Sequence, residues 1–345
     1  MIKMSNILFI HSSNMHESHR MFAEAIDADF MPAYTKEFNG FRRFIEAFKR
    51  AKELPDYDVY LLEGGMPLFP AYLKKRKNKN IKVIGLLADE TFINLVERQP
   101  HYSFAETFIH KISAKCLDGA IADSPFVKSY AEKILNVPIE IARPSISKEN
   151  YERLGRVKPD LESNVVISVG QPRYSIGMDI LVEQFKLVRN KFPELELWIV
   201  GRGHPKEYEK TEGVKVLGFV EDLSEVFEKA SLFVHAGRCS SYSIATVEAM
   251  RAGVPVIVSN MTGAKEIVEK VESEVKEEFG LKYEGYFFIQ PLNNIAEGII
   301  GYYNYDKEGK KLLSKKYRRE SEEFEPGKRC KHFKEVFEKL LEEIR

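Results

Sequence analysis

A loop of small and hydroxyl-bearing residues, 236–243, carries groups that could bind an anion. It lies between a short apolar run, 232–234, which predicts a buried strand, and a helical pattern that begins at Ile244. Ligands of such strand–loop–helix units bind at the carboxyl end of the strand, where the helix N-terminus presents free N–H groups. This stretch therefore predicts a ligand site.

Four polar side chains in and after this loop define the expected chemistry. The hydroxyl groups of Ser241 and Ser243, with the guanidinium group of Arg238 beside them, could bind a phosphate. Glu248, four residues into the helix, could accept hydrogen bonds from the hydroxyl groups of a ribose or another sugar.

Two further clusters follow predicted strands in the first half of the chain. Strand 57–62 leads into a carboxylate and two glycines, which allow a tight turn or the close approach of a ligand. Strand 82–87 leads into Ala88 and two acidic residues, whose carboxylates could orient a substrate hydroxyl group. For the first carboxylate, a loop residue satisfied by its neighbours is the alternative. These candidates are Glu63, Gly64, Gly65, Asp89 and Glu90.

Three histidines, His11, His16 and His19, lie at the end of the first predicted strand and in the loop after it. One of them could contact a substrate or a phosphate, and solvated loop histidines are the alternative. No carboxylate or cysteine pattern accompanies them, so we expect no bound metal.

The bulk composition bounds the class of protein. The 345 residues suffice for two domains, and 44% hydrophobic residues indicate a globular chain. Lys plus Arg equals Asp plus Glu at 52 each, so net charge gives no argument for nucleic acid as a partner. No apolar run reaches the roughly 18 residues that a membrane span needs.

The three cysteines lie far apart, without metal-ligand spacing: Cys116, Cys239 and Cys330. We expect reduced thiols and a cytoplasmic protein, because the apolar segment near the N-terminus is too short for a signal peptide. The abundance of Lys and Glu is typical of thermophile proteins.

An amphipathic helix is predicted over residues 38–54. Its apolar stripe contains Phe41, Phe44, Ile45 and Phe48, and basic residues lie beside it. The stripe could face the protein core, or the helix could touch an anionic membrane as a peripheral anchor.

The chain around Glu248 resembles the nucleotide-sugar-binding segment of the GT-B glycosyltransferases, in particular the retaining glycosyltransferase family four (group 1). That family typically reads Glu-Gly-Phe-Gly-Leu, then a second Glu followed by Ala-Met, then Gly-x-Pro-Val-Ile. Here residues 240–244 read Ser-Ser-Tyr-Ser-Ile, Glu248 precedes Ala-Met, and residues 253–257 read Gly-Val-Pro-Val-Ile. The second Glu of the family, expected to bind the ribose, therefore matches Glu248.

The resemblance implies a donor site built from several loops of the second half of the chain. The segment 218–220 matches the place where the family packs the nucleotide base, and Arg202 lies in a Gly-x-Gly turn. The donor candidates are Gly170, Arg173, Arg202, Gly218, Phe219, Val220, Arg238, Ser240, Ser241, Tyr242, Ser243, Ile244 and Glu248. On the acceptor side the candidates are His11 and residues 63–65, and the catalytic candidates are Asp89, Glu90 and Arg173.

Four positions depart from the family pattern: Ala88, Gln171, Ile176 and Ser240. The family has a His at the first, a leaving-group-binding Arg and Lys at the next two, and a sugar-binding Glu at the last. Arg173 is the only cation in its loop and could have taken over phosphate binding from a shifted position.

The implied fold is an α/β GT-B architecture, with two Rossmann-like domains that face a central cleft. Residues 1–150 would form the acceptor-side domain, 160–310 the nucleotide-sugar-binding domain, and 311–345 helices that pack back toward the N-terminal domain. The apolar face of the last helix contains Phe333 and Phe337.

The implied activity is metal-independent transfer of a sugar, with retention, from a UDP- or GDP-sugar to the hydroxyl group of a glycan or lipid-linked acceptor. No tightly bound cofactor is expected, and peripheral contact through 38–54 would place the protein at the inner membrane face. A family member without transfer activity, which binds a nucleotide or glycan or serves as a partner subunit, is the alternative. A nucleotide-sugar epimerase is a third possibility, since it shares the fold.

Overall fold

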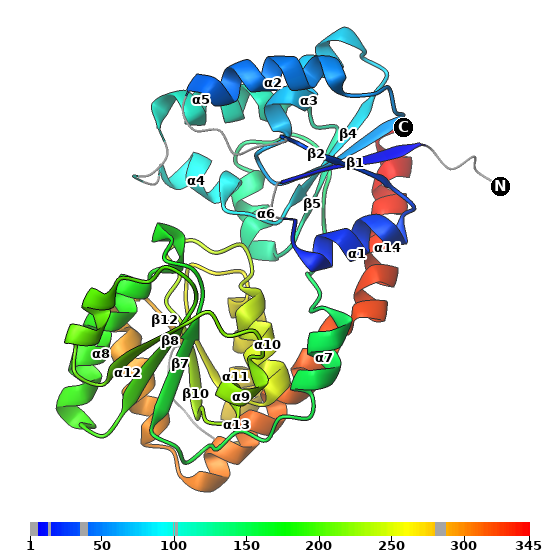
Figure 1. The fold of residues 1–345 in the computed structure, drawn as a ribbon. Coiled ribbons are helices and arrows are strands. Elements are labelled where there is room, and N and C mark those ends of the chain that lie inside the picture. The colour runs from blue at the N-terminus through cyan, green and yellow to red at the C-terminus, as the bar shows by residue number, and fades with distance from the viewer. Residues whose placement is uncertain (1–5, 13–14, 35–40, 99, 101–102, 280–287) are drawn as a thin grey trace. The chain divides into compact units, whose positions relative to one another are not determined.

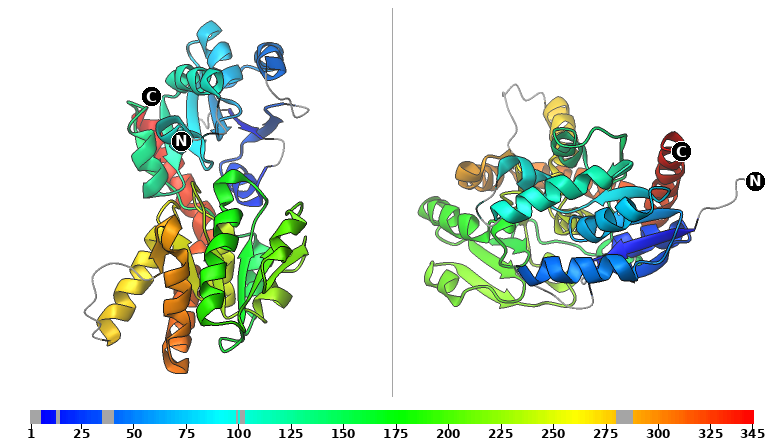
Figure 2. Two further views of the ribbon diagram at one scale, coloured as in Figure 1. Left: turned by 90° about the vertical axis from the view of Figure 1, so that its left-hand side faces the viewer. Right: turned by 90° about the horizontal axis from the view of Figure 1, so that it is seen from above.

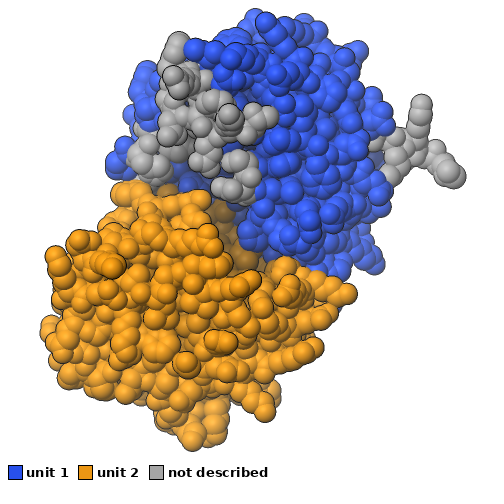
Figure 3. All heavy atoms as spheres, in the orientation of Figure 1, with its two compact units in different colours: residues 1–145, 326–345 blue, residues 146–325 orange. Residues whose placement is uncertain are grey.

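The computed structural model describes the chain apart from residues 1–5, 13–14, 35–40, 99, 101–102 and 280–287 (Figure 1). The chain divides into two compact units, residues 1–145 with 326–345, and residues 146–325. Each unit contains a parallel sheet with helices on both faces (Figures 1 and 2), which is the Rossmann-like arrangement that the sequence predicts. Figure 3 colours the two units separately.

The first unit is built on a six-stranded parallel sheet of order β2-β1-β3-β4-β5-β6. Most of its strands are fully buried apolar runs, as expected for a sheet covered on both faces. Strand β2 is short and half exposed, which explains why no apolar run predicts it. The strands are β1 Ile7–His11, β2 Asp29–Pro32, β3 Val59–Glu63, β4 Lys82–Leu87, β5 Gly119–Ala122 and β6 Ile139–Ile141.

Right-handed crossovers place the helices of this unit on two faces. Only the β1–β2 connection moves toward the β2 edge, so α1 covers one face, and the helices between β2 and β6 cover the other (Figure 1). The helices are α1 Glu17–Ala25, α2 Phe41–Glu53, α3 Leu68–Lys77, α4 Thr91–Glu97, α5 Phe104–Ser113, η1 Ala114–Cys116 and α6 Pro125–Ala131.

The last helix, α14 (Pro326–Glu343), belongs to this first unit and packs beside α1 (Figure 1). Its apolar face is buried: Phe333 stacks on Phe22 with ring centroids 4.5 Å apart, and Phe337 joins the same core. The preceding helix, α13 (Lys307–Glu320), lies in the second unit. The chain therefore changes unit at Pro326, later than residue 311.

The second unit has the strand order β12-β11-β10-β7-β8-β9. The chain moves outward in one direction from β7 and in the other from β10, so the order reverses between these neighbours. In open parallel sheets, ligands bind at such a reversal, beyond the carboxyl ends of the strands. The strands are β7 Val165–Val169, β8 Glu196–Val200, β9 Val214–Gly218, β10 Leu232–His235, β11 Val256–Ser259 and β12 Ile289–Gln290.

Helices cover both faces of this sheet, with α8 and α12 on one face and α10, α11 and α13 on the other (Figure 1). Residues 143–162, a polar stretch whose composition predicts a linker, contain α7, which packs on α10. The helices are α7 Lys148–Leu154, η2 Tyr174–Ile176, α8 Met178–Lys191, η3 Lys206–Lys210, α9 Ser224–Phe227, α10 Ile244–Ala252, α11 Lys265–Phe279, η4 Leu292–Asn294, α12 Ile295–Tyr303 and η5 Ser321–Phe324.

Among the residues described, no helix has the length and apolarity that crossing a bilayer requires.

Candidate active site

The loops after β7 and β10 pack backbone against backbone at the reversal of strand order. Gly177 has φ +69°, and a Cβ atom there would lie 2.0 Å from the carbonyl oxygen of Ala236. The backbone N–H of Arg238 donates to the Ser175 carbonyl at 2.8 Å. The predicted phosphate-binding residues of two separate loops are thereby brought together at the N-terminus of α8.

Ser243, at the N-cap of α10, adopts a left-handed conformation with φ +73°. The related family has Gly at this position, and Gly adopts this conformation without the strain of about 1–2 kcal/mol that other residues incur. The Ser243 hydroxyl group pairs with that of Thr246 at 2.8 Å instead of capping a helix N–H group. The structure thus retains the turn of the family although the Gly is replaced.

Glu248 is buried in α10, one turn after the loop. Asn150 of α7 donates from Nδ2 to its Oε1 atom at 2.8 Å, and Arg153 donates to the Asn150 side chain at 2.7 Å. Burial raises the pKa of Glu248 to about 7, and the hydrogen bond from Asn150 opposes this rise. A buried carboxylate with one protein donor retains acceptor capacity for a ligand hydroxyl group.

Arg238 already has a partner. Its guanidinium group forms two hydrogen bonds, of 2.8 and 2.6 Å, with the Asp179 carboxylate and lies 4.3 Å from the centre of the Tyr174 ring. The pKa of Asp179 is lowered by the Arg238 hydrogen bond. By contrast, the exposed Arg173 side chain has no ion pair among the described residues, so it is the better placed cation for a ligand phosphate.

A planar platform lies at the carboxyl ends of β8 and β9. The Arg202 guanidinium group lies 4.0 Å from the centre of the Phe219 ring, which is exposed. Gly218, with φ +71°, turns the chain just before it. An exposed aromatic ring paired with a guanidinium plane could stack on a nucleotide base.

The hydroxyl loop, residues 236–243, is held by β11 and by the turn that follows β11. The N–H group of Ser240 donates to the Met261 carbonyl at 3.0 Å. The ring of Tyr242 is buried and contacts Phe324, so only its backbone belongs to the loop surface. The side chain of Tyr242, a predicted donor residue, is therefore part of the core.

In the first unit, the carboxyl ends of β1 and β3 bring together a second polar cluster. Glu63 is buried, and its Oε1 atom accepts from His19 Nδ1 at 2.5 Å. Its Oε2 atom accepts from the backbone N–H of Ser12 at 2.7 Å and from the Ser12 hydroxyl group at 2.8 Å. His11 contacts the Ser12 carbonyl oxygen through Nδ1 at 2.7 Å.

Asp89 holds the glycine turn after β3. Its Oδ2 atom accepts from the Gly65 N–H at 2.9 Å, and its Oδ1 atom accepts from the Thr91 N–H at 3.0 Å. Gly64 has φ +66°, and a Cβ atom there would lie 2.2 Å from Asp89 Oδ2. Glu90 follows as the N-cap of α4, without a side-chain cap. Asp89 is therefore committed to backbone groups.

Sequence reasoning did not assign roles to Asn150, Asp179 or the His19–Glu63 pair. Asn150 lies in a stretch that reads as a linker, and Asp179 reads as an ordinary first-turn helix carboxylate. His19 carried a signal as one of three clustered histidines, but its partner lies 44 residues away. Among the described residues, no group of three or more His, Cys, Asp or Glu side chains could hold a metal ion.

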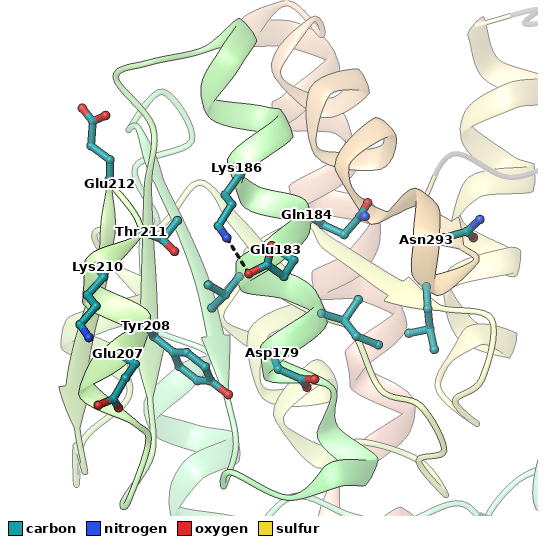
Figure 4. A pocket seen from close by; sticks show the side chains of 13 residues that line it. Asp179, Glu183, Gln184, Lys186, Glu207, Tyr208, Lys210, Thr211, Glu212 and Asn293 are labelled. Atoms are coloured by element: carbon teal, nitrogen blue, oxygen red, sulfur yellow. Dashed lines mark hydrogen bonds and ion pairs between the residues drawn. The ribbon is translucent and has the colours of Figure 1, made fainter.

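A groove of about 870 Å³ runs beside α8, with walls from η3 and η4 (Figure 4). Asp179, Tyr208 and the ion-paired Lys186 and Glu183 line it. Asp179 contacts Arg238, a predicted donor residue. No residue that lines this groove is itself a predicted donor residue. We therefore place the candidate site at the loops around Glu248.

The structure contains two Rossmann-like units. Where the strand order of the second unit reverses, it carries the Glu248 carboxylate and loops with arginine side chains. These features together define a GT-B protein. The sequence model of the family described as "Glycosyl transferases group 1" matches residues 163–281. An uncharacterized glycosyltransferase of Haemophilus influenzae is 26% identical over 270 residues, which are 72% of this chain and 67% of that protein. Mannosylfructose-phosphate synthase of Agrobacterium fabrum is 30% identical over 116 residues, 28% of this chain and 26% of that protein.

Solved structures share the fold over nearly the whole chain. Sucrose-phosphate synthase from Thermosynechococcus elongatus superposes with a TM-score of 0.75 at 15% identity and covers 98% of this chain and 99% of its own. Anabaena HepE, solved in complex with UDP and glucose, gives a TM-score of 0.70 at 16% identity, with 97% and 99% covered. Residues 163–281 thus match the group 1 glycosyltransferases, and the chain has the GT-B fold. The predicted fold class and the predicted resemblance to this family are confirmed.

Proposed function

We propose that this glycosyltransferase moves a sugar from a UDP- or GDP-sugar to an acceptor hydroxyl group, with retention at the anomeric carbon and without a bound metal ion. The observation that carries the donor assignment is the buried carboxylate of Glu248, which Asn150 holds one turn after the loop 236–243. The fold neighbours include HepE with UDP and glucose, and E. coli trehalose-6-phosphate protein with UDP-2-fluoro glucose. The nucleotides bound in these two structures support a nucleoside diphosphate as the donor class.

In this proposal each part of the donor has its own contacts. The ribose hydroxyl groups donate to Glu248, and the base stacks on the Arg202–Phe219 platform. The diphosphate lies between the N–H groups of the hydroxyl loop, with Ser241 and Ser243, and the guanidinium group of Arg173.

Stabilisation of the leaving diphosphate is then the main catalytic contribution. As the bond from the anomeric carbon to the diphosphate breaks, negative charge grows on the departing oxygen. Arg173 and the N–H groups at the start of α10 are the donors that would stabilise that charge. Arg238, held by Asp179, keeps the loop in position.

Calorimetric titration with UDP, GDP and ADP tests the donor site. One diphosphate should bind preferentially, and Glu248→Ala should weaken its binding, whereas Glu297→Ala, an exposed control on α12, should leave the binding unchanged. Equal binding to the Glu248→Ala variant contradicts the ribose assignment. No binding across the panel favours the alternative of a member without transfer activity, which the loss of cations at Gln171 and Ile176 would explain.

Stereochemistry and metal dependence have separate tests. Proton NMR of the first product formed shows whether the anomeric configuration of the donor is retained. Activity that persists in excess chelator supports the metal-independent mechanism, and activity restored only by a divalent cation contradicts it.

We further propose that the acceptor is lipid-linked and that α2 contacts an anionic membrane. The described part of its apolar stripe does not pack into the core: Phe48 is 54% exposed and Ile45 is also exposed. Core burial, the alternative expected for this stripe, is therefore wrong for these two side chains. Residues 38–40 and the side chains of 41–44 lie outside the described residues.

A second helix supports this surface. Both α2 and α5 pack on α3, and α5 exposes Phe104, at 88%, and Phe108. Exposed lysines follow the apolar residues on α2, on α5 and in the adjoining η1. These are Lys49, Lys52, Lys111 and Lys115. Aromatic side chains beside lysines are typical of helices that lie in the headgroup region of anionic bilayers.

Vesicle flotation tests the membrane proposal. The protein should float with phosphatidylglycerol-containing vesicles and not with neutral ones, and binding should weaken as salt rises. Phe48→Ala combined with Phe104→Ala should reduce flotation, whereas Leu187→Ala, which removes a 51% exposed side chain from the second unit, should not. Equal flotation with neutral vesicles, or no flotation, contradicts an anionic membrane contact.

A further inference from the structure

A series of polar contacts joins Glu248 to the loop that follows β9. Asn150 of α7 donates to Glu248 Oε1 at 2.8 Å, and Arg153, one turn later on α7, donates to Asn150 Oδ1 at 2.7 Å. The Nε atom of Arg153 lies 3.3 Å from Oδ1 of Asp222. All four residues belong to the second unit, so α7 contacts two separate parts of the candidate donor site.

Asp222 lies in the loop that carries the base platform. It comes three residues after Phe219, whose ring lies beside the guanidinium group of Arg202. Its Oδ1 atom accepts from the Ser224 N–H group at 2.9 Å and from the Ser224 hydroxyl group, so this carboxylate fixes the turn into α9. The hydrogen bonds from Ser224 and the charge of Arg153 hold the pKa of Asp222 below its usual value, so the carboxylate is ionised at neutral pH.

We propose that Arg153 is a positioning residue of the donor site, which holds the ribose contact Glu248 and the base loop 218–224 in one arrangement. The inference rests on the proposed donor site, and Arg153 acts through Glu248 and the loop without touching the nucleotide. Its guanidinium group suits this role because it carries several N–H donors in one plane and can hold two partners at once. The ribose and the base of the donor are then recognised as one unit.

Arg153 determines which end of the Asn150 amide faces Glu248. A guanidinium group donates but cannot accept, so Asn150 must present Oδ1 to Arg153 and its Nδ2 donor to Glu248. A donor at this place favours the ionised carboxylate. Without Arg153 the amide can turn over and accept a hydrogen bond from protonated Glu248, which favours the neutral form. The Asn150 bond and the charge of Arg153 both oppose the rise in the pKa of Glu248 that burial causes.

Charged groups on the other elements around α10 are engaged elsewhere. Arg251 of α10 and Arg318 of α13 donate to backbone carbonyl groups. His235 of β10 is neutral, because burial lowers its pKa to about 4. Arg153 is therefore the cation that acts on Glu248 through Asn150. The acidic residues of α9 and η5 are exposed or paired with a lysine: Glu225, Glu322 and Glu323.

Calorimetric titration at pH 6 to 9 tests this role in the full-length protein. The probes are UDP and GDP with their 2′,3′-dideoxy forms, which lack the hydroxyl groups that Glu248 would bind. Arg153→Met keeps an apolar stem of similar length and removes the charge and the donors. Because both proteins meet the same ligand, the ratio of their Kd values removes the ionisation of the diphosphate itself.

The pH profile distinguishes positioning from a general packing role. At pH 7 the Kd of the Arg153→Met variant should be about tenfold above wild type, since a rise of about one in the pKa of Glu248 lowers its ionised fraction by up to tenfold. The difference should shrink toward pH 9, where Glu248 is ionised in both proteins. The preference for ribose over dideoxyribose at pH 7 should fall in parallel.

Arg153→Lys separates the charge of this side chain from its geometry. Lysine keeps the charge and should retain the wild-type pH profile, but it lacks the planar fork and should lose the link between ribose and base. The link is measured by adding Phe219→Ala to each protein. The loss of affinity that Phe219→Ala causes should be smaller in either variant of Arg153 than in the wild type. An equal loss in all three proteins overturns the coupling.

Arg156→Met is the matched control, because Arg156 is an exposed arginine three residues later and should not affect binding. The ion pair of Arg153 with Asp222 is partly exposed, so Arg153→Met should leave the urea midpoint nearly unchanged. An Arg153→Met variant with the wild-type Kd at every pH, or with the same loss at pH 7 and pH 9, overturns the inference and leaves the donor site standing. Absence of nucleotide binding by the wild-type protein overturns the proposed function itself.

Discussion

Replacing Glu248 by Gln should stabilise the protein and weaken donor binding at the same time. The pKa of Glu248 rises from 4.5 to about 7 in the folded protein, chiefly because burial disfavours the ionised carboxylate. This difference corresponds to about 3 kcal/mol of unfavourable free energy once the group is ionised. Gln keeps an oxygen for the Asn150 hydrogen bond and has no charge to bury.

The sign of the pH dependence follows from where the proton is held. Between pH 4.5 and about 7 the folded state binds the Glu248 proton more tightly than the unfolded state does. Wild-type stability should therefore fall as pH rises through this window and become level above it. The Glu248→Gln variant lacks this contribution, so its advantage should be small at pH 5 and approach about 3 kcal/mol at pH 8.

Urea unfolding at pH 5 and pH 8 measures this difference. The single tryptophan, Trp198, lies in β8 of the second unit, so its fluorescence reports the unit that contains Glu248. A difference between variant and wild type that does not change with pH refutes the reasoning. So does a variant that is less stable at pH 8.

Donor binding should show the opposite sign. Ribose hydroxyl groups donate best to the ionised carboxylate, so wild-type affinity should rise with pH through about 7. Loss of a charged acceptor costs about 1.5–3 kcal/mol, which is a roughly 10- to 150-fold higher Kd in the Glu248→Gln variant. Calorimetry that shows equal affinity for variant and wild type at pH 8 excludes Glu248 from the nucleotide site.

Three further changes have defined outcomes. Gly177→Ala should lower the free energy of unfolding in urea clearly more than Gly218→Ala does. Both glycines have φ near +70°, but only a Cβ atom at Gly177 would meet a backbone oxygen, that of Ala236. Equal losses for the two variants contradict the packing of the two loops. Arg173→Ala should raise the Kd for UDP about tenfold or more and leave uridine binding unchanged, as measured by calorimetry; an equal effect on uridine contradicts phosphate contact. Phe333→Ala should destabilise the first unit by about 3–5 kcal/mol in scanning calorimetry, because it empties the space beside Phe22, and an unchanged transition contradicts the docking of α14.

Local patterns in the sequence predict most of the fold. The apolar run at 165–169 is β7, and the helical pattern from Ile244 to the stop at Gly253 is α10. These elements follow from periodicity and from residues that end helices, which are properties of neighbouring residues. The spacing of Glu248 within such a unit likewise places it one turn after the loop, since a helix fixes that geometry.

The exposure of the apolar stripe on α2 could not be predicted in this way. Periodicity shows that Ile45 and Phe48 share one face of a helix, but it is silent on what covers that face. The structure leaves these side chains exposed beside α3. Burial depends on how helices distant in sequence share the face of the sheet, which no local pattern contains.

The sequence by itself determined the two Rossmann-like units, the hydroxyl loop and the ribose-binding candidate Glu248. Only the tertiary structure decided which polar groups pair. Asn150 meets Glu248 from 98 residues away, Asp179 holds Arg238 across 59 residues, and Glu63 orients a histidine of α1. A buried polar group must find a partner wherever the packed strands and helices bring one within hydrogen-bond distance. That partner is fixed by strand order and crossover connections, and these emerge only when the whole chain has folded.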